Sequence, residues 1–183
     1  EPSLWAEVEA FATDNVDRAE LGSEDNVAVA RVGGTLVRES GRLTAALRSD
    51  LEYRHYLRNT YDDETLLNLD LVTRATLVEE RMFWVLEDTF GQLLTDTLLP
   101  DVVTNRGDIN VLRTGPDLVL RLSEQLRLEA SARYQDSYFE ATDLDGSSLG
   151  GSIGAYRLLG DTDTLGLQAD YTEYTPDLEL RPE

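Results

Sequence analysis

The sequence predicts an all-β protein, built as an antiparallel up-and-down meander of about nine to ten long strands that forms part or all of a transmembrane β-barrel. Three observations lead to this fold class. Apolar and polar residues alternate with period two in segment after segment, the connecting segments are alternately long and short, and no stretch approaches the ~18 consecutive apolar residues of a transmembrane helix. The 183 residues are expected to form one domain, 1–183.

The alternation is clearest in four segments. In residues 42–56, Leu43 and Leu47 share one face, whereas Arg48 and Asp50 share the other. A period of two is typical of a half-exposed strand and not of a helix. The same pattern predicts strands at residues 64–78, 126–134 and 164–174.

Weaker alternation predicts the remaining strands. These are expected at residues 4–13, 27–38, 82–92, 109–122 and 147–158. Residues 177–181 alternate as well, and then the sequence stops. We therefore expect a tenth strand that is cut short, in a chain truncated at its C-terminal end, because an unpaired strand edge is not tolerated in a bilayer.

The connections between these strands form an independent pattern. Along the chain they cover residues 14–26, 39–41, 57–63, 79–81, 93–108, 123–125, 141–146 and 160–163. Long and short connections thus alternate, which places short turns at one rim of the sheet and longer loops at the other. Outer-membrane barrels have this asymmetry, and a soluble meander has no reason to show it.

Composition narrows the range of functions. The formal net charge is -20, and such an acidic surface repels nucleic-acid phosphates and anionic headgroups, so no nucleic-acid partner is expected. The absence of Cys excludes disulfides and thiolate metal sites. All 16 basic residues are Arg, which suits bidentate pairing with enclosed carboxylates. Biased codon usage in a GC-rich genome explains the arginines equally well.

The polar faces of the strands supply the main candidate site. Strands this long, with apolar faces rich in Leu and Ala and polar faces that carry both signs of charge, favour a barrel over a soluble sandwich. The candidate lumen-lining residues are Arg42, Arg48, Asp50, Glu52, Arg54, Asp70, Arg74, Arg121, Arg127, Glu129, Arg133 and Asp170. In a wide lumen they would set selectivity, and in a narrow one they would pair with each other and fill it.

Metal and catalytic sites find little support in the sequence. Asp143 and Asp145 resemble part of a calcium loop, and Asp62 and Asp63 form a second carboxylate cluster, but neither has the full ligand set for Ca²⁺. His55, the only histidine, is predicted to lie on the apolar face, away from any lumen. We therefore expect no catalytic residue, no cofactor beyond weak Ca²⁺ binding at the loops, and no enzyme.

Glycine, proline and aromatic residues predict local features of the strands. Gly150, Gly151 and Pro116 lie within predicted strands and indicate a bend, a bulge or close approach of another chain. Aromatic residues near strand ends are expected to form girdles at the membrane interfaces. They are Trp5, Phe11, Tyr53, Tyr56, Phe83, Trp84, Phe90, Tyr134, Tyr138, Phe139, Tyr171 and Tyr174.

A family resemblance rests on three blocks in the middle of the chain. They are residues 80–92 (ERMFWVLEDTFGQ), the Asn-Arg and Asn-Val pairs at 105–106 and 110–111, and TGPDL at 114–118; the TDNV at 13–16 fits as well. With these blocks the chain resembles the uncharacterised outer-membrane β-barrel proteins associated with the PEP-CTERM/exosortase and exopolysaccharide system. The resemblance implies that this is the N-terminal part of a longer barrel. It supplies no catalytic or substrate-binding residue.

Pattern and resemblance together predict a barrel in the outer membrane of a Gram-negative bacterium. It would serve cell-surface or exopolysaccharide assembly as a pore, an export partner or a structural element. Its expected partners are outer-membrane lipid, polysaccharide or export-machinery proteins, and further copies of itself. Two alternatives stay open: a secreted or surface β-sheet module whose acidic loops bind cations, sugars or a protein, and a self-assembling β-sheet surface protein.

Overall fold

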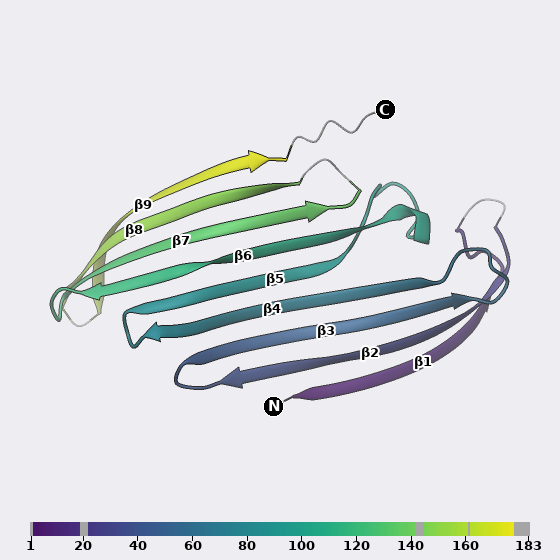
Figure 1. Cartoon of the computed structure of the whole chain (residues 1–183), viewed down its shortest axis with the longest axis horizontal. Coiled ribbons are helices and arrows are strands. Elements are labelled where there is room, and N and C mark those ends of the chain that lie inside the picture. The colour runs from purple at the N-terminus through teal and green to yellow at the C-terminus, as the bar shows by residue number, and fades with distance from the viewer. Residues whose placement is uncertain (1, 19–21, 142–144, 161, 178–183) are drawn as a thin grey trace.

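The structure, a computed structural model, describes residues 2–18, 22–141, 145–160 and 162–177. These residues form one antiparallel sheet in which every strand pairs with its neighbours in sequence, from β1 at one edge to β9 at the other (Figure 1). The elements are β1 (Ser3–Thr13), β2 (Asp25–Glu39), β3 (Leu43–Tyr56), β4 (Glu64–Val78), β5 (Met82–Leu94), η1 (Val103–Asn105), β6 (Arg106–Arg121), β7 (Leu126–Phe139), β8 (Gly146–Leu159) and β9 (Asp163–Pro176).

The predicted fold class is confirmed: the chain is all-β, and the sheet is a nine-stranded antiparallel meander. The sheet is not closed, because β1 and β9 do not pair, so the barrel itself stays a prediction. Several strands are longer than predicted. The largest difference is in β7, which runs on to Phe139 because polar residues 135–137 still pair with β6 and β8. Apart from Asp177, the predicted tenth strand lies outside the described residues.

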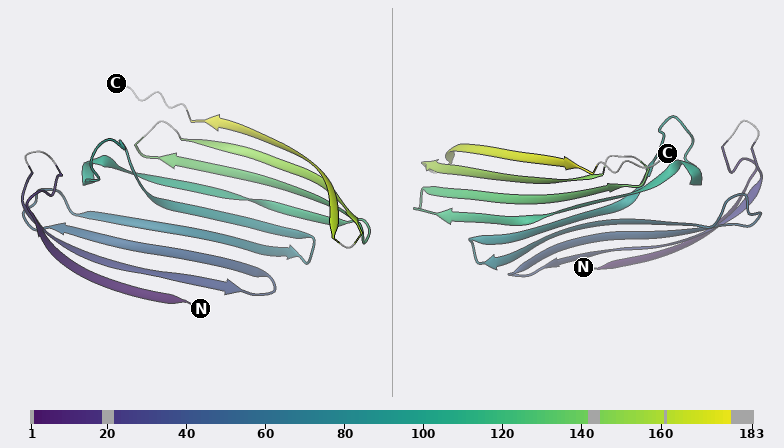
Figure 2. Two further views of the ribbon diagram at one scale, coloured as in Figure 1. Left: turned by 180° about the vertical axis from the view of Figure 1, so that it is seen from behind. Right: turned by 45° about the horizontal axis from the view of Figure 1, so that its top comes forward.

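The sheet is a single curved layer (Figure 2). Every extensive contact between its strands joins neighbours in sequence, so no second layer packs on either face within the described part of the chain. Large apolar side chains are left uncovered, such as Leu4 (88% exposed), Val8 (84%) and Leu167 (80%). No helix in the same part of the chain is both long enough and apolar enough to span a membrane.

The two rims of the sheet differ as predicted. Residues 40–42, 79–81 and 122–125 make short turns at one rim, on the left of Figure 1. Residues 14–24, 57–63 and 95–105 connect the strands at the opposite rim. We call these the turn rim and the loop rim.

The strand breakers act differently from one another. At Gly115 and Pro116 the pairing of β6 with β7 is interrupted, while the register on both sides is unchanged, so the expected kink is a gap in the ladder and not an inserted residue. A register shift occurs between Thr76 and Val78, where β4 approaches its turn to β5. Gly150 and Gly151 pair in unbroken register with both neighbouring strands, so no bulge occurs there. The neighbouring strand does approach closely, because a Cβ on Gly151 would lie 3.2 Å from the carbonyl oxygen of Ser131.

Candidate functional site

The sheet brings the predicted lumen-lining residues together on one face, which we call the polar face. Cross-strand register shows this directly: Arg48 lies opposite Asp70, and Arg127 lies opposite Arg121. All the candidates that lie on strands point to the polar face, because the pairing register keeps alternate positions of neighbouring strands aligned from β3 to β9. Arg42 is the exception, because it lies in the turn between β2 and β3 and not on a strand.

Ion pairs join the first three strands on the polar face. Arg31 on β2 contacts Glu7 at 3.6 Å and Glu9 at 3.2 Å on β1, and its Nε donates to Glu52 on β3 at 2.5 Å. Arg54 also donates to Glu52. One row of side chains across β1–β3 therefore alternates in sign. Whether these charges line or fill a lumen stays a prediction, because the sheet is not closed.

The second half of the polar face is organised around Arg133. Its Nη1 donates to the carbonyl oxygens of Pro116 (3.0 Å) and Ala132 (2.8 Å), and its Nη2 donates to Asp117 at 2.5 Å. The guanidinium thus bridges the two strands where their pairing is interrupted, and it satisfies a carbonyl group of each. Only a planar, multiply donating side chain serves acceptors in these directions at once.

Sequence reasoning missed several charged residues of this face. They are Glu7, Glu9, Arg31, Glu87, Arg113 and Asp117, all of which form ion pairs across neighbouring strands. Their odd or even position within the strand would have identified them as polar-face residues once the weaker strands were assigned. Between β6 and β9 the polar face is hollowed, with Arg113, Arg133 and Asp170 around the small residues Gly150 and Ser152 of β8.

At the loop rim, the connections fold over the polar face. Val27, Val29 and Tyr56 are at most 4% exposed, and together they form a small apolar cluster on β2 and β3. One residue from each of these three connections packs on this cluster: Val16, Tyr61 and Val103. The ring of Tyr61 meets that of Tyr56 edge to face, with 5.5 Å between centroids, a favourable aromatic geometry.

Hydrogen bonds hold the first two of these connections in place. The buried carboxylate of Asp25 accepts the backbone N–H groups of Arg58 at 2.8 Å and Thr60 at 3.2 Å. In the first connection, the carboxylate of Asp17 accepts the backbone N–H and the hydroxyl of Ser23. Buried backbone donors need such partners, and these bonds fix the loops against the strands.

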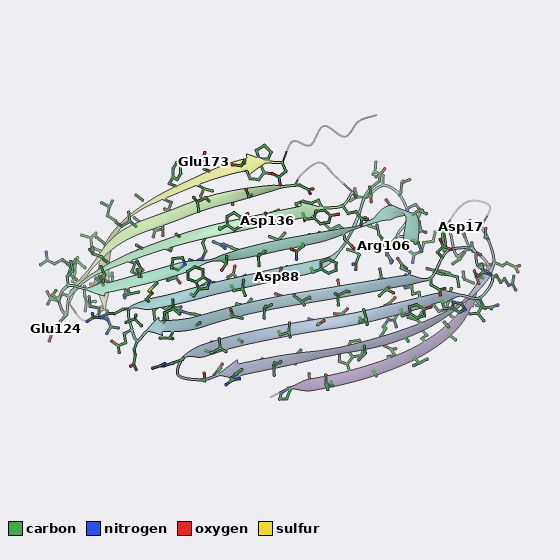
Figure 3. The ribbon with its side chains drawn as sticks, in the orientation of Figure 1. Asp17, Asp88, Arg106, Glu124, Asp136 and Glu173 are labelled. Carbon is green, nitrogen blue, oxygen red and sulfur yellow. The ribbon has the colours of Figure 1, made fainter. Side chains whose placement is uncertain are left out.

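The connection between β5 and β6 is tied down by charge. Arg106 donates to Glu64 on β4 at 2.8 Å and to Asp101 in the same connection at 2.7 Å, and Arg54 lies 3.6 Å from the other Glu64 oxygen. Figure 3 places Arg106 beside this connection. The hydrogen bond from Arg106 holds the pKa of the Asp101 carboxyl below its usual range.

The predicted loop carboxylates do not converge on one another. Asp63 accepts hydrogen bonds from Tyr53 (2.5 Å) and from His55 Nδ1 (2.7 Å), which lower the pKa of its carboxyl. Asp62 lies exposed beside it. Asp145 accepts the backbone N–H of Phe139, and Asp143 lies outside the described residues. Where the structure describes the chain, no three His, Cys, Asp or Glu side chains are placed to share a metal ion.

The face opposite the polar face, which we call the apolar face, has tyrosines near the loop rim. Tyrosine hydroxyls there donate to carboxylates that lie closer to that rim: Tyr134 to Asp136 at 3.1 Å and Tyr171 to Glu173 at 3.2 Å. Tyr53 does the same with Asp63. Tyrosine rings on an apolar surface with their hydroxyls turned toward water and charge are typical of a membrane interface.

Only half of the predicted aromatic girdle lies on this face. By register the apolar face carries Tyr53, Trp84, Phe90, Tyr134, Tyr138 and Tyr171. The polar face carries Trp5, Phe11, Tyr56, Phe83, Phe139 and Tyr174. Nearness to a strand end did not reveal the face, because face depends on odd or even position within the strand.

Comparison with known proteins adds no relative. No model of a known protein family matches the chain. Curated proteins give no match, and solved structures give none either. The resemblance to the exosortase-associated barrels therefore stays a prediction.

Proposed function

We propose that this chain forms wall strands of an outer-membrane β-barrel, with the apolar face toward lipid and the polar face toward the interior. The observation that carries the proposal is the contrast between the two faces. Ion pairs lie along the polar face and the connections fold over its loop end, whereas large hydrophobic side chains such as Leu4 and Leu167 are exposed on the apolar face. Exposed apolar area of this extent marks a surface made for lipid or a partner.

The dimensions of the apolar band support a bilayer as that partner. On β3 the band extends from Leu43 beside the turn to Tyr53, and on β7 from Leu126 to Tyr134. These stretches are roughly ten residues long, close to the ~9–11 residues with which a tilted strand crosses the hydrocarbon core. The tyrosine–carboxylate pairs would then lie at the interface on the loop side.

The biological role follows from the resemblance in residues 80–92, 105–111 and 114–118. On that basis we propose an outer-membrane protein of a Gram-negative bacterium, associated with cell-surface or exopolysaccharide assembly. It would act as a pore, an export partner or a structural element. The mutual ion pairing on the polar face favours a largely filled or narrow interior near β1–β3.

The two tryptophans of the chain give a direct test. Trp84 lies on the apolar face, and Trp5 lies on the polar face over Gly33. The variant Trp5→Phe leaves Trp84 as the only indole, and Trp84→Phe leaves Trp5. Each variant is folded into vesicles whose acyl chains carry bromine, a contact quencher of tryptophan, and compared with unbrominated vesicles.

We expect bromine to quench most of the Trp84 emission and little of the Trp5 emission, because only the first indole faces acyl chains. Equal quenching of both variants would show that the faces are not sorted between lipid and interior. If neither is quenched and the protein stays in solution as a β-sheet monomer, the proposal fails. The acidic loops would then point to a secreted binding module, and large soluble assemblies would indicate self-association through the strand edges.

A further inference from the structure

Three of the connections at the loop rim form a cover over one end of the polar face, as far as the described residues show. Val16, Tyr61 and Val103 come from three different connections, and all three pack on Val27, Val29 and Tyr56. Val29 is 2% exposed, although it belongs to a face that elsewhere is open: Val37, on the same strand and face, is 47% exposed. The cover therefore shields only the loop end of the face.

One charged group joins the cover to the sheet. Arg106 has a side chain that is 13% exposed; it donates to Glu64, which is 8% exposed and belongs to β4, and to Asp101, which belongs to the cover. Arg106 is the first residue of β6, so its contact with Glu64 lies within the sheet and holds the guanidinium in place. The contact with Asp101, whose side chain is 44% exposed, is the charged contact that ties the connection down, and it favours the closed arrangement.

The rest of the β5–β6 connection is built as a rigid unit. The side-chain amide of Asn105, 5% exposed, donates to the carbonyl oxygens of Asp96, Leu99 and Pro100, and its oxygen accepts the N–H of Asp96. A segment braced internally in this way moves as one body about its ends. Loss of the Arg106–Asp101 contact would therefore loosen the connection as a unit, which is then held by the packing of Val103.

We propose that this cover is a latched lid, in which the β5–β6 connection closes the loop end of the polar face and the Glu64–Arg106–Asp101 contacts are the latch. Its role as a gate at the mouth of a barrel interior rests on the proposed function. The existence of the lid does not, because its contacts lie within the chain and its opening can be followed in detergent without any bilayer.

Accessibility of Val29 is the experimental readout. The chain contains no Cys, so Val29→Cys introduces a single thiol beneath the lid, and Val37→Cys places the matched control on the same face outside it. In detergent we expect a charged maleimide to label Val29→Cys at least ~10-fold more slowly than Val37→Cys, because labelling requires local opening. Equal rates would show that no closed lid exists.

The latch is tested by adding Arg106→Gln to each thiol variant. We expect it to raise the labelling rate of Val29→Cys toward that of the control, and Arg113→Gln, which removes a polar-face arginine paired with Glu87 at 3.6 Å, to leave the rate unchanged. Circular dichroism verifies the sheet. If Arg106→Gln does not fold, Asp101→Asn replaces it, since this change breaks only the lid side of the latch. If a latch variant folds and its Val29→Cys thiol is still labelled slowly, the lid proposal is overturned. If the thiol is labelled faster but bromolipid does not quench Trp84, the lid exists and the proposed membrane role is refuted.

Discussion

Gly115 is the position at which the smallest change is expected to do the most damage. It has a φ of 156°, and a Cβ atom placed on it would lie 2.0 Å from the carbonyl oxygen of Ala132. Carbon and carbonyl oxygen normally stay at least ~3.3 Å apart, so Gly115→Ala forces β6 and β7 apart by more than about 1 Å. That movement also pulls the carbonyl groups of Pro116 and Ala132 away from Arg133.

Overpacking of this kind and the weakened Arg133 contacts together cost about 2–3 kcal/mol. With a urea m-value of roughly 2 kcal/mol/M, the unfolding midpoint should fall by about 1 M. The measurement is urea unfolding in detergent micelles, followed by the emission of Trp84, the cross-strand neighbour of Pro116 on β5. Gly41→Ala is the control, because nothing lies within 4 Å of a Cβ at that turn position. Equal midpoints for the two variants would refute the steric reasoning.

Two further changes test the charged contacts. Arg133→Lys should lower the free energy of unfolding by about 1 kcal/mol, because an ammonium group cannot replace the planar guanidinium that reaches two carbonyls and a carboxylate. The same urea titration measures this loss. An unchanged unfolding midpoint would contradict the bridging role of Arg133. The Asp101 carboxyl should titrate below the ~3.9 of a free Asp side chain, because Arg106 lowers its pKa, and Arg106→Gln should raise that midpoint in an NMR titration. The pKa of Asp101 is lower in the folded state than in the unfolded state. The contact therefore stabilises the lid fully above the unfolded-state pKa, and this stabilisation is lost as the pH falls through the folded-state pKa. If Arg106→Gln leaves the titration midpoint of Asp101 unchanged, the pairing is ruled out.

The nine strands, their order and the faces of the clearly alternating segments could be predicted from the amino-acid sequence. The reason is local: a strand places successive side chains on opposite faces, so the polar and apolar positions of residues 42–56 or 126–134 can be read without knowing what they contact. Short connections then force consecutive strands to pair as antiparallel neighbours. This is why Arg48, Asp70 and the other strand candidates share one face in the structure.

The position of the loops and the pairing of the charges, by contrast, could not be predicted before the three-dimensional structure was in view. Asp25 reaches the backbone of Arg58, and Glu64 reaches Arg106, across separations of 33 and 42 residues. No periodic pattern records contacts of that kind, because they depend on where the curvature and register of the sheet bring distant segments together. The long connections looked like solvated loops in the sequence, yet three of them bury Val29 and Tyr56, because that cluster of side chains at the loop rim can be kept from water only by segments that fold back over the sheet.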